Sequence, residues 1–258
     1  MADALTPMLH VESVSKTFGG LKAVNNVSLS VQAGTLTALI GPNGAGKTTL
    51  FALMSGFITP HTGRVLLDGR DITGQAPDAN ARWGLARTFQ IVQPFAAQTV
   101  RENIAVGAHL HTRSRSLALE RAEAVAEQVG LTTQLDKPAG DLTVAGRKRL
   151  ELARTLATQP RLLLLDEVLA GLNPHEIAEM IPVVRGIADS GITVLMIEHV
   201  MQAVMNLAEY VWVLAQGQLI AQGKPAEVTQ NAAVVEAYLG KGMAARLNSQ
   251  AIASEQTP

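Results

Sequence analysis

The stretch that decides the fold is Leu36-Thr-Ala-Leu-Ile-Gly-Pro-Asn-Gly-Ala-Gly-Lys-Thr-Thr-Leu50. Residues 36–40 are mostly apolar and predict a buried strand, and a helix is expected to start at Lys47. Between them lies a glycine-rich loop, whose glycines allow successive backbone N–H groups to turn inward. A strand, a tight loop and a helix N-terminus in this order form a geometry that binds anions.

The loop also fills the four fixed positions of the pattern G-x-x-x-x-G-K-[ST]. In that pattern the lysine reaches the β- and γ-phosphates of a nucleotide, and the following hydroxyl holds Mg²⁺. A chance glycine turn between a strand and a helix is the alternative, and the complete pattern argues against it. We therefore predict a site for the phosphates of a nucleotide and Mg²⁺, formed by Gly41, Pro42, Asn43, Gly44, Ala45, Gly46, Lys47, Thr48 and Thr49.

The composition is ordinary for a globular chain of 258 residues, with 47% hydrophobic residues and a formal net charge of −1. Near-neutral charge and an aromatic content of 3% argue against a nucleic-acid partner, because such proteins carry basic surfaces and stacking rings. The chain has no cysteine, which excludes a disulfide framework and fits a reducing compartment.

No segment predicts a membrane crossing. Apolar runs such as 162–165 and 192–197 are far shorter than the roughly 20 residues that a spanning helix needs. The N-terminus shows no basic region followed by an apolar core, so we expect no signal peptide. The chain is expected not to cross a membrane by itself, although it can lie against one through a partner.

Two acidic residues give a second chemical signal. Four consecutive leucines, 162–165, predict a parallel strand covered on both faces, and Asp166 and Glu167 follow at the strand end where α/β sheets place ligands. A magnesium nucleotide needs a carboxylate for its metal, which Asp166 would supply, and Glu167 could orient or deprotonate water. The pair alone is also typical of a solvated strand end. The phosphate loop favours the catalytic interpretation.

The first part of the chain alternates strands with turns. Apolar alternation predicts strands over 9–15 and 24–31, and together with 64–68 they suggest a small antiparallel sheet beside the phosphate loop. Phe18 lies in the turn between the first two strands. Its ring is equally compatible with core packing and with stacking on a purine.

The middle of the chain is mostly helical. Thr99 and Glu102 form a capping box for a helix that ends near residue 110. A second helix is expected over about 116–129, with Leu117, Leu119, Val125 and Val129 on its apolar face. A third is expected from about Gly146 to residue 158.

The last part of the chain returns to alternating elements. Asn173 and Pro174 start a helix to about residue 190, and Pro182 should kink it. A buried strand follows over 192–197, and a hairpin turns at Gln216 and Gly217. Short helices near 224–227 and 232–239 end the pattern.

These elements predict an α/β fold with one domain over residues 1–240. A P-loop NTPase core (1–90 and 159–240) carries a flanking antiparallel β subdomain and an inserted helical subdomain (91–158). Residues 241–258 are small and polar and are expected to be a flexible tail.

In this order, the motifs resemble those of an ATP-binding cassette (ABC) ATPase, the motor subunit of ABC transporters, over nearly the whole chain. The residues that carry the resemblance are Gly41–Thr49, Gln90, Leu150-Glu-Leu-Ala-Arg154, Leu162-Leu-Leu-Leu-Asp-Glu167, Gly171-Leu-Asn-Pro174 and His199. The resemblance implies that Phe18 stacks on adenine and that Gln90 couples the Mg²⁺ site to a partner. It also implies that Asp166 binds Mg²⁺, that Glu167 is the general base and that His199 contacts the γ-phosphate.

One motif departs from the family. The signature Leu-Ser-Gly-Gly-Gln maps onto Leu142-Thr-Val-Ala-Gly146, where Thr143 keeps a hydroxyl that could bind a γ-phosphate. In the family this loop acts in trans, on ATP held by an opposite cassette, so a second ABC ATPase subunit is expected, identical or different. Val144 and Ala145 replace both glycines and could hold the backbone further from that phosphate.

Within the superfamily the chain is most similar to cassettes of branched-chain amino-acid importers. The phrases are Lys16-Thr-Phe-Gly-Gly-Leu-Lys-Ala-Val24, Ala86-Arg-Thr-Phe-Gln90, Ala170-Gly-Leu-Asn-Pro174, Ile197-Glu-His-Val-Met201 and Ala237-Tyr-Leu-Gly240. The resemblance implies transmembrane permease subunits as partners, a periplasmic solute-binding protein as an indirect one, and a peripheral place on the cytoplasmic face of the inner membrane. Residues 91–95 would face a groove that takes a short permease helix.

Three alternatives compete with this interpretation, and a cassette of another kind of ABC transporter is the strongest of them. A cassette of an exporter or a lipid transporter shares the same motor, and the residues do not touch the solute. A non-transport cassette usually has two cassettes in one chain or a long coiled-coil insertion, and neither is visible. A GTPase normally needs the guanine-reading tetrapeptide Asn-Lys-x-Asp, which does not occur here.

Overall fold

The computed structural model describes residues 6–90 and 93–239. Its largest element is a six-stranded sheet with the order β10-β9-β3-β8-β7-β6. Neighbouring strands from β9 to β6 pair in parallel, and β10 pairs antiparallel at one edge. The strands are β3 (Leu36–Ile40), β6 (Leu85–Arg87), β7 (Leu162–Asp166), β8 (Thr193–Ile197), β9 (Tyr210–Ala215) and β10 (Gln218–Gly223).

The second sheet is smaller and antiparallel, as predicted. Its order is β2-β1-β4-β5, from strands β1 (Leu9–Phe18), β2 (Leu21–Val31), β4 (Thr62–Leu67) and β5 (Arg70–Asp71). The first two strands extend further than predicted, up to a turn at Gly19 and Gly20 with Phe18 paired to Leu21. Phe18 is therefore the last residue of a strand, next to the turn.

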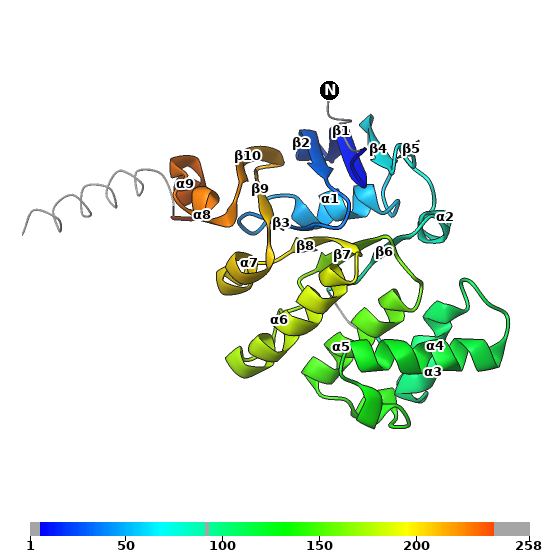
Figure 1. Cartoon of the computed structure of the whole chain (residues 1–258). Helices are drawn as coiled ribbons and strands as arrows, with labels where there is room; N and C mark the ends of the chain where they lie inside the picture. The colour runs from blue at the N-terminus through cyan, green and yellow to red at the C-terminus, as the bar shows by residue number, and fades with distance from the viewer. Residues whose placement is uncertain (1–5, 91–92, 240–258) are drawn as a thin grey trace, which may run out of the picture.

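Helix α1 (Lys47–Met54) lies between the two sheets, as Figure 1 shows. Its buried residues join side chains of β1, β2 and β4 in one core with one face of the large sheet, including Leu162 and Leu164. Leu163 and Leu165 face the other way, into a second core. The four leucines are thus covered on both faces, which confirms that part of the prediction.

The second core is covered by helices. Helices α6 (Pro174–Asp189) and α7 (Met201–Leu207) contribute to it, and so do α3 (Val100–Ala108), α4 (Arg115–Gln128) and α5 (Val144–Leu156). Figure 1 shows α3, α4 and α5 grouped together at one side, beyond the β6 edge. The C-terminal helices α8 (Pro225–Thr229) and α9 (Ala232–Leu239) lie beside the β9–β10 hairpin. Helix α2 (Pro77–Arg82) connects β5 to β6.

Two details of the helices differ from the prediction. Helix α5 begins at Val144, two residues earlier than expected, because the Thr143 hydroxyl accepts a hydrogen bond from the Gly146 amide and caps the helix. Helix α4 buries a stripe of alanines and Val125, whereas Leu117 is exposed. Small side chains allow α3 and α4 to approach closely, which a pattern of large apolar residues does not reveal.

The predicted capping box at Thr99 is present, and the predicted N-cap Asn173 also forms a capping box, with Glu176. Pro182 lies inside α6. The helices α2 and α7 and the strands β5 and β6 were not anticipated. In the described part of the chain, no helix combines the length and the apolar character needed to cross a bilayer.

Candidate nucleotide site and the adjoining groove

The predicted phosphate loop connects the central strand β3 to α1, at the carboxyl end of the parallel strands. Gly41 and Gly46 have positive φ angles of 152° and 103°. A Cβ atom on Gly41 would lie 1.9 Å from the Leu214 carbonyl oxygen, and one on Gly46 would lie 2.2 Å from that of Ala23. Glycine is therefore required at both positions, because a backbone carbonyl of the large sheet lies against Gly41 and one of the small sheet lies against Gly46.

The turn of the β9–β10 hairpin also holds the loop. The Gly217 amide donates to the Ala45 carbonyl at 2.9 Å, and the Asn25 amide donates to the Gly217 carbonyl at 2.8 Å. Strand β2, the hairpin turn and the phosphate loop are thus joined in series. The first N–H groups of α1 have no acceptor within the helix, so they are available to an anion.

Lys47 is buried against the loop that precedes it. Its Nζ donates to the carbonyl oxygens of Gly41 at 2.8 Å and Pro42 at 3.1 Å. Burial lowers the pKa of Lys47, and the nearby carboxylates of Glu167 and Asp166 partly oppose that effect. A desolvated ammonium that is held only by carbonyls is well prepared to bind phosphate.

A pocket of about 1120 Å³ opens in front of this loop and brings together most of the predicted site. Phe18 lies at one side, where its ring is 45% exposed and faces the Lys16 ammonium at 5.6 Å. The predicted residues that line the pocket are Phe18, Asn43, Gly44, Ala45, Gly46, Lys47, Thr48, Thr49, Gln90, Glu167 and His199. Segments from five parts of the chain therefore meet at one cavity.

Glu167 and Gln90 contact each other at the rim of the pocket. The Gln90 Nε2 donates to Glu167 Oε2 at 2.7 Å. Glu167 has a φ of +51°, a conformation that is unfavourable for a residue with a side chain, and its amide donates to the Ile197 carbonyl. Strained backbone of this kind is concentrated at functional sites, so the geometry supports a specific orientation of the Glu167 carboxylate.

Asp166 is buried directly behind the pocket. Its amide donates to the Thr88 hydroxyl at 3.0 Å, and its Oδ2 accepts from Arg87 at 2.8 Å. In the described residues Oδ1 has no hydrogen-bond partner although it is buried. A buried, unpaired carboxylate oxygen costs free energy unless a cation or water satisfies it, so the donor set fits Mg²⁺ bound together with Thr48 and phosphate oxygens.

His199 follows β8 and lines the pocket beside Glu167. The preceding residue, Glu198, is buried, and its Oε1 accepts from the Leu169 amide at 3.0 Å. Burial raises the pKa of Glu198 to about 7, the amides of Leu169 and His199 lower it, and the charge of Glu167 raises it further. Glu198 thus ties the end of β8 to the loop that follows β7.

Thr143 lies at the N-terminus of α5, and in the described structure it is not among the residues of this pocket. Its oxygen accepts from Gly146, and Val144 beside it is 54% exposed. The hydroxyl hydrogen remains able to donate to a phosphate.

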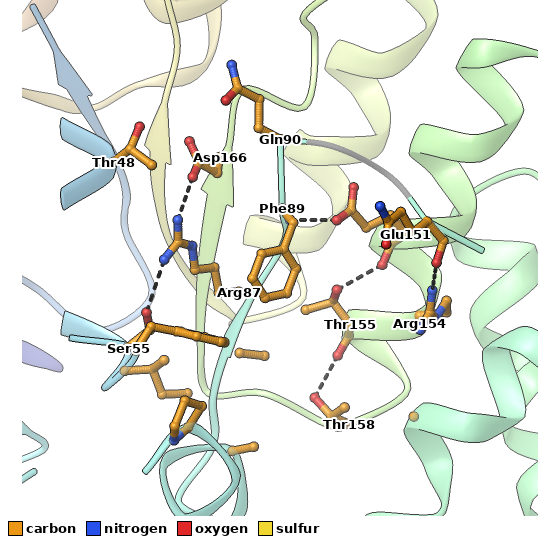
Figure 2. Close-up of a pocket in the computed structure, with 17 residues that line it drawn as sticks. Thr48, Ser55, Arg87, Phe89, Gln90, Glu151, Arg154, Thr155, Thr158 and Asp166 are labelled. Carbon is orange, nitrogen blue, oxygen red and sulfur yellow. Dashed lines mark hydrogen bonds and ion pairs between the residues drawn. The ribbon is translucent and has the colours of Figure 1, made fainter. Parts of the chain in front are cut away.

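A second cavity, of about 720 Å³, adjoins the first between the core and the helical layer (Figure 2). We call it the groove. Phe57 and Phe89 are half-exposed in it, with ring centroids 5.4 Å apart in an edge-to-face contact. Other residues that line it are Ser55, Arg87, Gln93, Glu151, Arg154, Thr155 and Thr158, together with Thr48, Gln90 and Asp166.

Helix α5 holds the segment around Gln90 through side chains spaced three residues apart. Lys148 donates to the carbonyls of Gln90 and Glu167 at 3.4 and 3.2 Å. Glu151 accepts from the Phe89 amide at 2.5 Å, and Arg154 donates to the Gln93 carbonyl at 3.1 Å. The helical layer is thereby tied to the residues that carry Gln90 and Glu167.

Sequence reasoning missed these three side chains and Arg87. Lys148, Glu151 and Arg154 could have been found from the sequence, because residues three apart lie on the same face of a helix. Arg87 was detectable only as one charge in a short apolar strand. The partner of that charge, Asp166, is 79 residues away in sequence.

The chain is similar to known proteins over most of its length. A family model described as ABC transporter matches residues 24–170, and one described as branched-chain amino acid ATP-binding cassette transporter matches residues 218–244. Among curated relatives, the high-affinity branched-chain amino acid transport ATP-binding protein BraF of Pseudomonas aeruginosa is 39% identical over 251 residues, covering 91% of this chain and 98% of that protein. LivG of Salmonella typhimurium, with the same description, is 40% identical at the same coverage.

Solved structures give the same answer. An ATP-binding cassette of an ABC transporter in its ADP conformation superposes with a TM-score of 0.83 and 34% identity, covering 91% of this chain and 99% of the other. A nucleotide-free cassette superposes equally well, at 33% identity. Fold and site thus define an ABC transporter ATPase, a protein that binds ATP.

Within that class the chain belongs to the family of branched-chain amino acid transport ATP-binding proteins, of the LivG and BraF type.

Proposed function

We propose that this chain is the ATP-hydrolysing motor of an importer for branched-chain amino acids, paired with a second cassette and docked on transmembrane permease subunits. The observation that carries the proposal is the single pocket that joins the phosphate loop to Gln90, Glu167 and His199. The names of the relatives supply the solute class, because their transport systems are described as high-affinity systems for branched-chain amino acids.

Each site residue has a role that its position supports. Lys47 would exchange its two carbonyl partners for phosphate oxygens, and the amides of residues 43–49 would surround the same phosphates. Thr48 and Asp166 would hold Mg²⁺, which when bound neutralises charge on the phosphate oxygens. The ring of Phe18 is exposed at the side of the pocket, where it can stack on adenine.

Hydrolysis needs a base for the attacking water, and Glu167 is the carboxylate at the pocket rim. The side-chain amide of Gln90 would hold the Oε2 of Glu167 in place, which leaves the Oε1 of Glu167 to accept a proton from water. His199 would donate a hydrogen bond to the terminal phosphate. Thr143 would act on ATP bound to the opposite cassette, so a single chain would not form a complete ATP site.

The groove would receive a short helix of the permease. Its half-exposed rings, Phe57 and Phe89, offer an apolar contact. Arg154 also lines the groove, and its guanidinium lies 5.0 Å from the centroid of the Phe95 ring. Of the predicted contact segment 91–95, residues 91 and 92 lie outside the described residues. We propose that docking places the chain on the cytoplasmic face of the inner membrane.

The test is to co-express the chain with candidate permeases, a second cassette and the periplasmic binding protein, and to measure ATPase activity in the purified assembly. Leucine, isoleucine or valine on the binding protein should stimulate hydrolysis, and Lys47→Ala, which should weaken nucleotide binding, sets the background. Absence of a permease in the purified material, or activity that ignores all three amino acids while another solute stimulates it, would contradict the proposal.

A further inference from the structure

Arg87 is a buried cation between the groove and the predicted metal carboxylate. Its side chain is 8% exposed, and its Nη2 donates to Asp166 Oδ2 at 2.8 Å. Its Nη1 donates weakly to the Ser55 hydroxyl, at 3.4 Å, just beyond the end of α1. The guanidinium therefore lies where β6, the end of β7 and the phosphate-loop helix meet.

Three phenylalanines surround the same guanidinium. The ring centroids of Phe51, Phe57 and Phe89 lie 5.8, 5.7 and 5.5 Å from its central carbon, within the range of cation–π attraction. Phe51 is fully buried in α1, whereas Phe57 and Phe89 line the groove and are about half exposed. Figure 2 shows the Arg87 side chain between Ser55 and Asp166, with Phe89 to one side. A group that binds in the groove and packs on Phe57 and Phe89 would therefore affect the position of the guanidinium.

Asp166 depends on Arg87 for its orientation. Within the described part of the chain, Arg87 is the side chain that holds Oδ2, and Oδ1 has no partner. The bond from the Asp166 amide to Thr88 fixes the backbone but leaves the carboxylate free to rotate. The ion pair between Arg87 and Oδ2 keeps Oδ1 free for a metal ion, and without Arg87 the carboxylate would lose this orientation.

We propose that Arg87 is a positioning residue that fixes Asp166 for magnesium and makes its position depend on what packs in the groove. The first part stands on the ion pair alone. The second part rests on the proposed function, because it takes the groove to be the place where the permease docks.

The planar shape of the guanidinium separates this role from simple charge compensation. A lysine at position 87 would neutralise Asp166, but its compact ammonium lacks the planar, delocalised guanidinium that here donates to both Asp166 and Ser55 from among three rings. Arg87→Lys should therefore keep the fold and part of the magnesium response, and Arg87→Met should lose more of that response.

The experiment measures how far Mg²⁺ tightens nucleotide binding, using the full chain and a non-hydrolysable ATP analogue with Mg²⁺ or with EDTA. In Arg87→Met we expect the dissociation constant in EDTA to stay within about twofold and the gain from Mg²⁺ to fall about tenfold. In Arg87→Lys the gain in affinity from Mg²⁺ should be about threefold smaller than in the wild type. Phe57→Leu, which removes one ring but keeps an apolar wall, should lose a similar amount if the groove bears on Asp166.

Arg161→Met is the matched control, because Arg161 precedes the same strand β7 and its guanidinium also pairs with an aspartate, Asp68, at 2.7 Å. It should leave the magnesium gain unchanged. A full magnesium gain in Arg87→Met would overturn the positioning role, and a full gain in Phe57→Leu would overturn the link to the groove. If Arg87→Met does not fold by circular dichroism, Arg87→Lys decides the first part in the same way.

These measurements use the isolated chain, so they are independent of the transport assay. Failure of the permeases to copurify would contradict the proposed function and leave the result on Asp166 standing.

Discussion

At the scale of single residues, the phosphate loop is determined by what surrounds it as much as by what it binds. Gly46 faces the Ala23 carbonyl of the small sheet, whereas Gly44 also has a positive φ, of 77°, but would place a Cβ in open space. The two glycines therefore allow conformational strain to be separated from steric overlap.

Gly44→Ala should destabilise the chain by about 1–2 kcal/mol, the cost of a left-handed residue with a side chain. Gly46→Ala should cost at least about 2 kcal/mol more, because the backbone must move away from a carbonyl 2.2 Å from the new atom. Denaturant unfolding of both variants measures the difference. Equal stabilities would mean that the loop is not confined by the small sheet.

Glu167→Gln tests the base. The amide keeps the size of the side chain and a hydrogen bond to Gln90, but it cannot accept a proton, so hydrolysis in the assembled complex should fall at least about 100-fold. Binding of an ATP analogue should stay within about threefold of the wild-type affinity. Normal turnover would remove Glu167 from the role of base.

At the scale of elements, Glu198 joins two strands that carry site residues. Its folded-state pKa is raised from 4.5 to about 7, so the folded chain binds more protons than the unfolded chain between those values. Stability from this group is fully present below about pH 4.5 and is lost as the pH rises through about 7.

Glu198→Gln should remove that pH dependence while keeping an oxygen that accepts from Leu169. From pH 4.5 to pH 8, the unfolding free energy of the wild type should fall by up to roughly 3 kcal/mol more than that of the variant. Urea unfolding at the two pH values measures it, and Glu127→Gln on the exposed face of α4 is the control. A difference that does not change with pH would show that Glu198 is ionised throughout.

Elements were predictable where local chemistry determines them. The loop 41–49, the leucine strand and the N-caps at Thr99 and Asn173 each contain their own signal within a few residues. Contacts between distant segments had no such signal: nothing near Arg87 indicates Asp166, and nothing near Ala45 indicates Gly217. The site was predictable from motif residues, whereas the side chains that hold those residues in place were not.

At the scale of the whole molecule, the signature loop faces outward from the end of α5. Val144 is exposed and occupies the first turn of the helix next to Thr143. If this loop acts on the ATP of an opposite cassette, as we propose, the Val144 side chain would lie between the two.

Restoring glycine at positions 144 and 145 should raise ATP turnover in the assembled complex about two- to tenfold if those side chains hinder closure. The change should also cost roughly 0.5–1 kcal/mol of stability per residue, because glycine weakens a helix. Turnover at saturating ATP and thermal unfolding measure the two effects. Unchanged turnover would show that the opposing site already closes fully.

The series of bonds from β2 through the hairpin turn to the phosphate loop has a consequence for synthesis. The loop is made early, but β8 and β9, the strands on both sides of β3, and Gly217, which holds Ala45, are made about 170 residues later. At roughly 5–20 residues per second, the ribosome needs about 10–30 s to supply them. A nascent chain therefore carries its complete phosphate-loop motif for many seconds before the strands and the turn that hold the loop have been made, and the turn at Gly217 is the last of them.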